Sequence, residues 1–228
     1  MSTIAANIST LESRIHAAAL AARRDPASVG LLAVSKTKPA SAIREAFAAG
    51  LRDFGENYLQ EALGKQAELS DLPLCWHFIG PIQSNKTRAI AEHFDWVHSV
   101  DRLKIAQRLS EQRPPQLEPL NICIQVNVSG EASKSGCTPQ DLPMLAEAIS
   151  ALPRLRLRGL MAIPEPTDDI EAQQAAFATV TSLQQALNLP LDTLSMGMSH
   201  DLEAAISQGA TWVRIGTALF GARDYGQP

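Results

Sequence analysis

Cysteines and long apolar runs are scarce in this sequence. It has 3 cysteines among 228 residues, and no apolar run is long enough to span a bilayer. Three cysteines cannot close a disulfide framework, and these three are not spaced as metal ligands are. We therefore expect a protein of the reducing cytoplasm with no membrane partner and no metal ion.

Charge is also nearly balanced. The chain has 20 lysines and arginines against 24 aspartates and glutamates, a formal net charge of −4. Proteins that bind nucleic acid or anionic membranes usually carry a basic excess, so nucleic acid is not an expected partner. The amino terminus has no basic stretch followed by an apolar segment, and no secretory signal is expected.

What the sequence does have is a regular alternation of strand and helix patterns. Apolar residues at helical spacing predict a first helix from about Ser2 to Arg24. Eight short apolar segments follow, each succeeded by a helical pattern. The expected strands lie at about 31–34, 53–57, 76–80, 96–100, 121–128, 157–163, 193–197 and 212–216.

This alternation predicts the fold. Eight strand–helix units without an internal linker indicate one α/β domain over residues 1–228, a single (β/α)8 TIM barrel with an extra N-terminal helix. The alternative is an open doubly wound sheet. It is less favoured because no G-x-G-x-x-G motif follows the first strand.

Lys36 is the first candidate for chemistry. It follows the apolar run Leu31–Val34, which is typical of a strand buried on both faces, and it shares a face with Leu32. A buried ammonium is unfavourable unless it is paired or loses its proton, and a neutral amine can form an imine with an aldehyde. From this segment alone, a solvated loop lysine is the alternative.

The ends of the last two strands have the composition of an anion site. Ser199 follows the seventh strand and is a predicted helix N-cap, and Gly216 and Thr217 follow the eighth. Glycine lets backbone amides approach an anion, and barrels often bind phosphate at these two loops. Ordinary turn chemistry is the alternative for each loop alone.

Further polar side chains are expected at the same mouth. Arg214 lies inside the eighth strand and points toward the pocket if its face is the barrel interior. Its alternative role is a structural ion pair with an interior carboxylate such as Glu56. Asn57 and Met161 also lie at strand ends, where barrel enzymes place their sites.

Two histidines lie within predicted strands. We interpret His77 and His98 as satisfied core residues, because no H-x-x-H or H-E-x-x-H motif or carboxylate cluster accompanies them. No G-x-S-x-G motif supports a serine hydrolase.

An aldehyde that carries a phosphate fits the predicted site. Pyridoxal 5′-phosphate would form an imine with Lys36, place its phosphate near Ser199, Gly216 and Thr217, and turn its pyridine nitrogen toward Arg214. A cation at that nitrogen weakens the ring as an electron sink. This argues against transaminase-like chemistry.

Several segments together resemble the pyridoxal phosphate homeostasis proteins, over nearly the whole chain. They are AVSKTK at 33–38, FGENY at 54–58, WHFIG at 76–80, QSNK at 83–86, SKSG at 133–136, RGLM at 158–161, GMS at 197–199 and RIGT at 214–217. The resemblance implies the fold of the alanine racemase N-terminal barrel and pyridoxal phosphate carried on Lys36. It implies that Ser199, Arg214, Gly216 and Thr217 surround the cofactor, and that the function lies in vitamin B6 balance.

The resemblance leaves a carrier and a racemase open. Racemisation needs acid or base groups on both faces of the substrate, and Lys36 supplies one. Related racemases bring a tyrosine from a second domain, whereas this sequence has only Tyr58 and Tyr225. We therefore expect no catalytic residue and a monomer that stores the cofactor or delivers it to apo pyridoxal phosphate enzymes.

Two alternatives to the single-site carrier stay open. One is a racemase of low activity, and the other is a sugar-phosphate barrel enzyme that uses Lys36 as an aldolase-type lysine. Lys38 and Lys134 are candidates for a second cofactor site.

Overall fold

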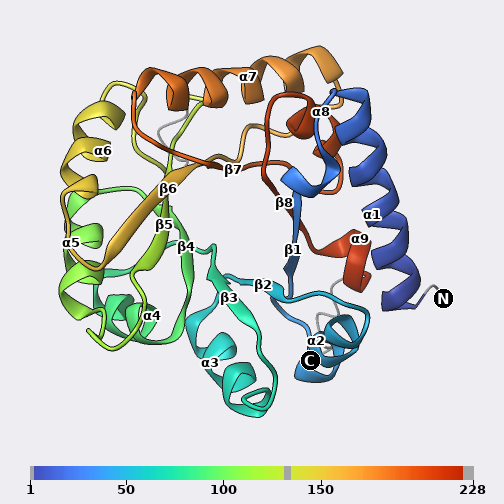
Figure 1. Cartoon of the computed structure of the whole chain (residues 1–228), viewed down its shortest axis with the longest axis horizontal. Coiled ribbons are helices and arrows are strands. Elements are labelled where there is room, and N and C mark those ends of the chain that lie inside the picture. Colours follow the sequence, from blue (N-terminus) through green and yellow to red (C-terminus); the bar gives the residue numbers. More distant parts are fainter. Residues whose placement is uncertain (1–2, 131–134, 223–228) are drawn as a thin grey trace, which may run out of the picture.

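The strands close into a barrel in chain order, and β8 pairs back to β1 (Figure 1). The computed structural model describes residues 3–130 and 135–222. All eight strands of this part are parallel: β1 Gly30–Val34, β2 Asp53–Glu56, β3 Cys75–Phe78, β4 Trp96–Val100, β5 Leu120–Gln125, β6 Leu155–Met161, β7 Thr193–Ser195 and β8 Trp212–Ile215. The predicted TIM barrel is confirmed, and the open sheet is wrong.

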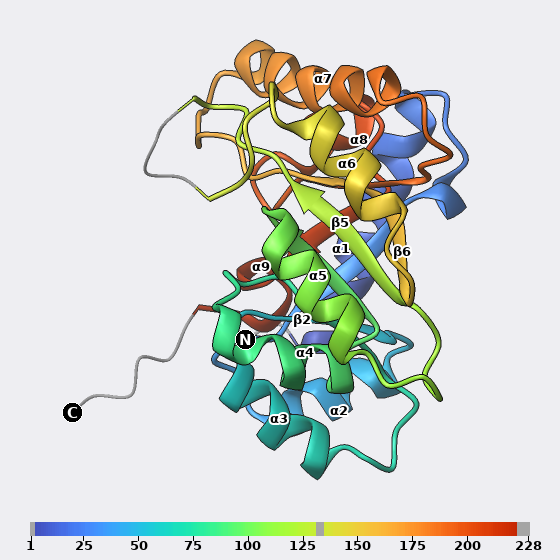
Figure 2. The ribbon, with the colours of Figure 1, turned by 90° about the vertical axis from the view of Figure 1, so that its left-hand side faces the viewer.

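The helices form a ring around the strands (Figure 1). They are α1 Ile4–Ala21, α2 Ala40–Ala48, α3 Leu59–Glu68, α4 Thr87–His93, α5 Leu103–Gln112, α6 Leu142–Ser150, α7 Ile170–Ala186, α8 Leu202–Ser207 and α9 Thr217–Phe220. Figure 2 shows α4, α5 and α6 on the outer side of the barrel next to β5. Among the described residues, no helix combines the length and the apolar character needed to cross a membrane.

The extra N-terminal helix is present as α1. The hydroxyl of Thr3 caps it by accepting a hydrogen bond from the Ala6 N–H at 3.2 Å. Its buried face, which includes Ile8 and Leu11, packs against α8 and α9 near the other end of the chain. The helix therefore covers the seam at which the barrel closes.

Strand side chains alternate between two compartments. One set, which includes Ala33, Phe54 and Val213, belongs to the main apolar core between strands and helices. The other set lies inside the barrel, where Trp96, Cys123 and Met161 form a separate buried cluster. This second compartment also holds buried polar side chains, which are described below.

Candidate functional site

Lys36, Gly216 and Thr217 line one small cavity at the carboxyl-terminal end of the barrel, together with Val34 and Lys38. The pairing of β1 with β8 causes this proximity, because Ala33 stands opposite Ile215 in the sheet. Residues that lie some 180 positions apart in the chain thus meet at one rim. The structure brings together three of the site residues expected from the sequence.

The backbone before Lys36 is held by a buried ion pair. The Ser35 hydroxyl donates to Glu56 Oε1 at 2.6 Å, and Lys65 Nζ donates both to the Ser35 carbonyl and to Glu56 Oε1 at 2.8 Å. Burial raises the pKa of Glu56, while the neighbouring Lys65 ammonium opposes that rise. The loop that presents Lys36 is thereby fixed from the helix side of β1 and β2.

This arrangement corrects one expectation. Glu56 does not pair with Arg214, because its side chain lies on the helix side of the sheet with Lys65. The side chains of Glu56 and Arg214 point to opposite faces of the sheet. Glu56 shares the outward face with Phe54, and Arg214 lies on the inward face.

The residue after Lys36 has a strained backbone. Thr37 has φ +63°, in the left-handed region that β-branched residues rarely adopt. Its N–H donates to Glu61 Oε1 at 2.6 Å, and Glu61 also pairs with Lys65. Strain of this kind tends to occur where a side chain must be presented in one direction, here the direction of Lys36.

Lys38 lines the same cavity, and its Nζ donates to the Ala222 carbonyl at 2.6 Å. Whether it serves as a second cofactor site stays a prediction. The other candidate, Lys134, and the second tyrosine, Tyr225, lie outside the described residues.

Arg214 is buried inside the barrel, with 5% of its surface exposed. One end of the guanidinium, Nη1, donates to the Ser195 hydroxyl at 2.8 Å, and Nη2 donates to the Ala162 carbonyl at 3.0 Å. Burial lowers its pKa to about 10, and the Asp201 carboxylate opposes that shift. The guanidinium is therefore still charged at neutral pH.

Ser199 occupies the turn between β7 and α8 and is half-buried. The prediction that it caps α8 is wrong, because the helix begins at Leu202 and its cap position is Asp201. The Asp201 carboxylate accepts from the Met198 N–H at 2.6 Å and closes the turn. Ser199 is not among the described residues that line the Lys36 cavity.

Asn57 and Met161 also stand at strand ends but outside that cavity. The Asn57 Oδ1 atom is buried and has no hydrogen-bond partner in the part of the chain that the structure describes. Gly80 packs on the Asn57 backbone, since a Cβ there would lie 2.2 Å from the Asn57 carbonyl oxygen. Met161 is 1% exposed and packs inside the barrel.

His77 and His98 are fully buried and hydrogen-bonded to each other at 2.8 Å, as expected of satisfied core histidines. The partners at the two ends of the pair, Asp53 and Ser195, were missed from the sequence. Their only local signal is that each sits at an inward position of a short strand.

Asp53, Cys75 and His77 place one oxygen, one sulfur and one nitrogen within 4.8 Å of one another, which no sequence motif indicated. His77 Nε2 and Asp53 Oδ1 are already hydrogen-bonded at 3.1 Å. Burial and the neighbouring carboxylates raise the pKa of the Cys75 thiol strongly. The three groups therefore satisfy one another with the thiol protonated.

Comparison with known sequences identifies the family. The model of the alanine racemase N-terminal domain matches residues 2–224. A pyridoxal phosphate homeostasis protein of Pseudomonas aeruginosa is 79% identical over 228 residues, which cover 100% of this chain and 99% of that protein. The chain belongs to the pyridoxal phosphate homeostasis protein family. The Escherichia coli K12 member is 54% identical over 235 residues and is covered to 99%, as is this chain.

Solved structures agree with this membership. PipY of Synechococcus elongatus, whose structure has pyridoxal phosphate bound, is 44% identical with a TM-score of 0.85, and the match covers 96% of this chain and 100% of PipY. Alanine racemase of Corynebacterium glutamicum has a TM-score of 0.68 at 18% identity, and the match covers 99% of this chain and 63% of the racemase. The racemase thus shares the barrel fold of this family member.

Proposed function

We propose that this protein binds pyridoxal 5′-phosphate at the carboxyl-terminal mouth of its single barrel domain and acts as a carrier in pyridoxal phosphate homeostasis. The observation that carries the proposal is the shared cavity of Lys36, Gly216 and Thr217. The family name of its relatives and the cofactor bound to PipY support it.

The chemistry of the residues fits that cofactor. Lys36 offers a primary amine at the rim, and Arg214 offers a charged donor inside the barrel. Asn57 Oδ1, which is buried and has no hydrogen-bond partner among residues 3–130 and 135–222, is a polar atom left for a ligand at the same end. A site for an aldehyde, an aromatic nitrogen and a phosphate needs these types of group.

When bound, pyridoxal phosphate supplies an aldehyde that can form an imine with an amine, and a pyridine ring that can withdraw electrons. Lys36 would hold it covalently. The first N–H groups of α9 have no intrahelical acceptor, so the backbone at Gly216 and Thr217 would receive the phosphate, assisted by Ser199 across the rim. Arg214 would face the ring nitrogen as a donor and keep that nitrogen unprotonated.

The exposed position of Tyr58 favours the carrier role over catalysis. Tyr58 is 54% exposed at the start of α3, where its ring faces solvent. It is therefore not poised as a second acid or base opposite Lys36. We propose a monomeric carrier that stores the cofactor or passes it to apo enzymes, with a weak amino-acid racemase as the second candidate.

The test of cofactor binding is the visible absorbance of the protein mixed with pyridoxal phosphate. Wild type and the exposed-lysine control Lys104→Ala should show the band of bound cofactor, and Lys36→Ala should lose it. Borohydride treatment followed by peptide mass spectrometry should locate the cofactor on Lys36. A band that persists in Lys36→Ala would contradict the assignment.

Two assays separate carrier from racemase. A carrier should activate an apo pyridoxal phosphate enzyme faster than the free cofactor at its equilibrium concentration. A racemase should exchange the α-hydrogen of alanine with solvent deuterium, so an unchanged NMR spectrum after long incubation removes that candidate.

A further inference from the structure

Five side chains form one continuous hydrogen-bonded chain through the barrel interior. Arg214 Nη1 lies 2.8 Å from Ser195 Oγ, and Ser195 Oγ lies 2.7 Å from His98 Nδ1. His98 Nε2 lies 2.8 Å from His77 Nδ1, and His77 Nε2 lies 3.1 Å from Asp53 Oδ1. We call these five residues the interior chain.

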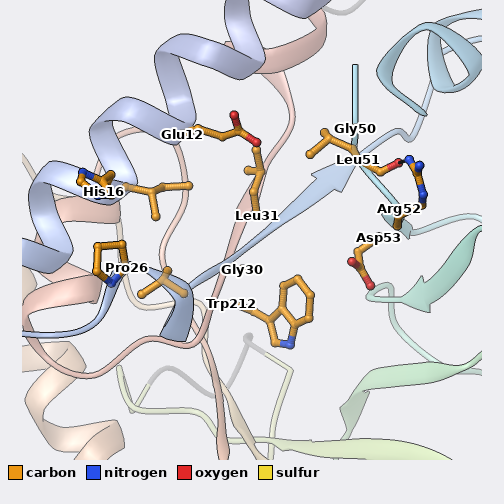
Figure 3. A pocket seen from close by; sticks show the side chains of 12 residues that line it. Glu12, His16, Pro26, Gly30, Leu31, Gly50, Leu51, Arg52, Asp53 and Trp212 are labelled. Carbon is orange, nitrogen blue, oxygen red and sulfur yellow. Dashed lines mark hydrogen bonds between the residues drawn. The ribbon is translucent and has the colours of Figure 1, made fainter. Parts of the chain in front are cut away.

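The interior chain crosses the barrel. Its members come from β2, β3, β4, β7 and β8, and the His98–Ser195 bond joins β4 to β7, which are not neighbours in the sheet. Asp53 begins β2 and lines a cavity of about 340 Å³ at the amino-terminal end of the barrel, where Figure 3 shows it facing Trp212. The interior chain therefore runs from that end to Arg214, next to the proposed cofactor mouth.

The donor and the acceptor of each hydrogen bond in the interior chain can be assigned by starting at Arg214. A guanidinium can only donate, so Ser195 Oγ accepts from Arg214. His98 Nδ1 is the only acceptor within reach of the Ser195 hydroxyl among the described residues, so Ser195 donates to it. His98 must then carry its proton on Nε2 and donate to His77 Nδ1. His77 in turn donates from Nε2 to Asp53.

The surroundings keep both imidazoles neutral and immobile. The His77 ring stacks on Trp96 at 5.5 Å between centroids with 4° between planes, and it meets Trp212 edge-on at 5.3 Å. Burial lowers the pKa of His77, and burial together with the Arg214 charge lowers the pKa of His98 well below its usual value. The only charges of the interior chain therefore stand at its two ends.

We propose that Asp53, His77, His98 and Ser195 are positioning residues that hold the Arg214 guanidinium in one orientation at the cofactor mouth. They do so as a one-way series of donors that ends on the Asp53 carboxylate. The inference deepens the proposed function, on which it rests for what Arg214 meets. With Nη1 and Nη2 each committed to an acceptor, only the remaining N–H groups are left to face a ligand.

The first experiment needs no cofactor. Long-range ¹H–¹⁵N NMR spectra of the histidine rings, assigned with single substitutions, should show His77 and His98 as neutral rings protonated on Nε2 at neutral pH. An Nδ1-protonated ring or an imidazolium at either position would overturn the one-way series.

The second experiment measures the dissociation constant of pyridoxal phosphate and the absorbance maximum of the bound cofactor. Ser195→Ala should weaken binding roughly tenfold, because the loss of a hydrogen bond to a charged group frees the guanidinium. It should also shift the absorbance maximum, and Ser195→Thr should restore both. Unchanged affinity and absorbance in a folded Ser195→Ala protein would overturn the positioning role.

The third experiment changes Asp53, the end of the interior chain that lies farthest from Arg214. Asp53→Asn removes the terminal charge from a partly exposed side chain and leaves an amide oxygen that can still accept from His77. The variant should therefore fold, which its circular dichroism spectrum checks, and it should shift the absorbance maximum of bound cofactor. Glu12→Gln removes the same charge from the same cavity without touching the interior chain, and it should cause no shift (Figure 3). Equal spectra for Asp53→Asn and wild type would overturn the coupling.

Failure of the proposed function has a different signature. If wild type does not bind pyridoxal phosphate, the function fails, and the tautomers seen by NMR still decide whether the one-way series exists. If wild type binds and the Ser195 and Asp53 variants match it, the function stands and the inference falls.

Discussion

Lys65 Nζ lies 2.8 Å from Glu56 Oε1, and both side chains are buried between α3 and the strands β1 and β2. The same ammonium donates to the Ser35 carbonyl, the residue just before Lys36. A charge pair this deep is an uncommon structural element, because each partner has been removed from water. Its position indicates that its role is to hold the backbone that presents Lys36.

Removal of one partner of this pair should therefore be costly. Lys65→Met leaves the Glu56 carboxylate buried without its cation, and we expect a loss of about 3–5 kcal/mol in the free energy of unfolding. Urea denaturation measures this loss. The double variant Lys65→Met, Glu56→Gln should recover part of it, and a single variant as stable as wild type would contradict the prediction.

Stability should fall in mild acid because of His77 and His98. Both have lowered pKa values in the folded protein and an ordinary pKa near 6.5 when unfolded, so below about pH 6.5 only the unfolded chain takes up protons. The free energy of unfolding should drop by at most ~1.4 kcal/mol per pH unit for each histidine. Above about pH 6.5, the titration of the two histidines should not change the free energy of unfolding.

Denaturation at several pH values between about 7.5 and 5.5 tests this pH dependence. His98→Gln should make the profile shallower than that of wild type. Equal slopes for His98→Gln and wild type would show that the buried ring is not the source.

Gly80 should not tolerate a side chain. In Gly80→Ala the new Cβ would meet the Asn57 backbone at 2.2 Å, so β2 and β3 must separate at the carboxyl-terminal end of the barrel. We expect a loss of about 1–3 kcal/mol in stability and weaker binding of pyridoxal phosphate.

A second glycine provides the matched control. Gly64 lies within α3, and a Cβ there has open space, so Gly64→Ala should raise stability by about 0.5–1 kcal/mol through helix propensity. Thermal unfolding and a cofactor titration of both variants separate the two glycines. Similar behaviour of the two variants would refute the close packing of Gly80 on Asn57.

Lys38 should not be needed for the visible absorbance band of the bound cofactor. Its Nζ is bonded to the Ala222 carbonyl, so Lys38→Ala should keep the absorbance band of bound cofactor and lose only the tether to residues after α9. Absorbance titration gives the stoichiometry. A drop from two bound cofactors to one would instead identify Lys38 as a second site.

The barrel could be predicted because buried parallel strands appear in the sequence as short apolar runs. Ser199 was assigned the wrong capping role because Asp201, two residues on, closes the turn through the Met198 N–H. Glu56 was given the wrong partner because the alternation of side chains along a strand does not show which face points into the barrel. Its actual partner, Lys65, lies on a helix, and the local sequence does not distinguish it from an exposed lysine.

The interior chain could not be predicted for a different reason. His98 and Ser195 are 97 positions apart and belong to strands that are not neighbours. Local patterns give the face of a strand on which a side chain lies, but they do not give which side chain meets it across the barrel. That depends on the closure of the whole sheet.

Closure of β8 onto β1 also sets when the site can exist during synthesis. The lysine follows the first strand, whereas its glycine and threonine neighbours follow the eighth, so the ribosome supplies them some 180 residues later. A nascent chain that lacks the eighth strand has no cavity for a ligand to enter. Binding of pyridoxal phosphate at the proposed site would therefore require the eighth strand to be in place, and a ligand added during refolding should report that step of assembly.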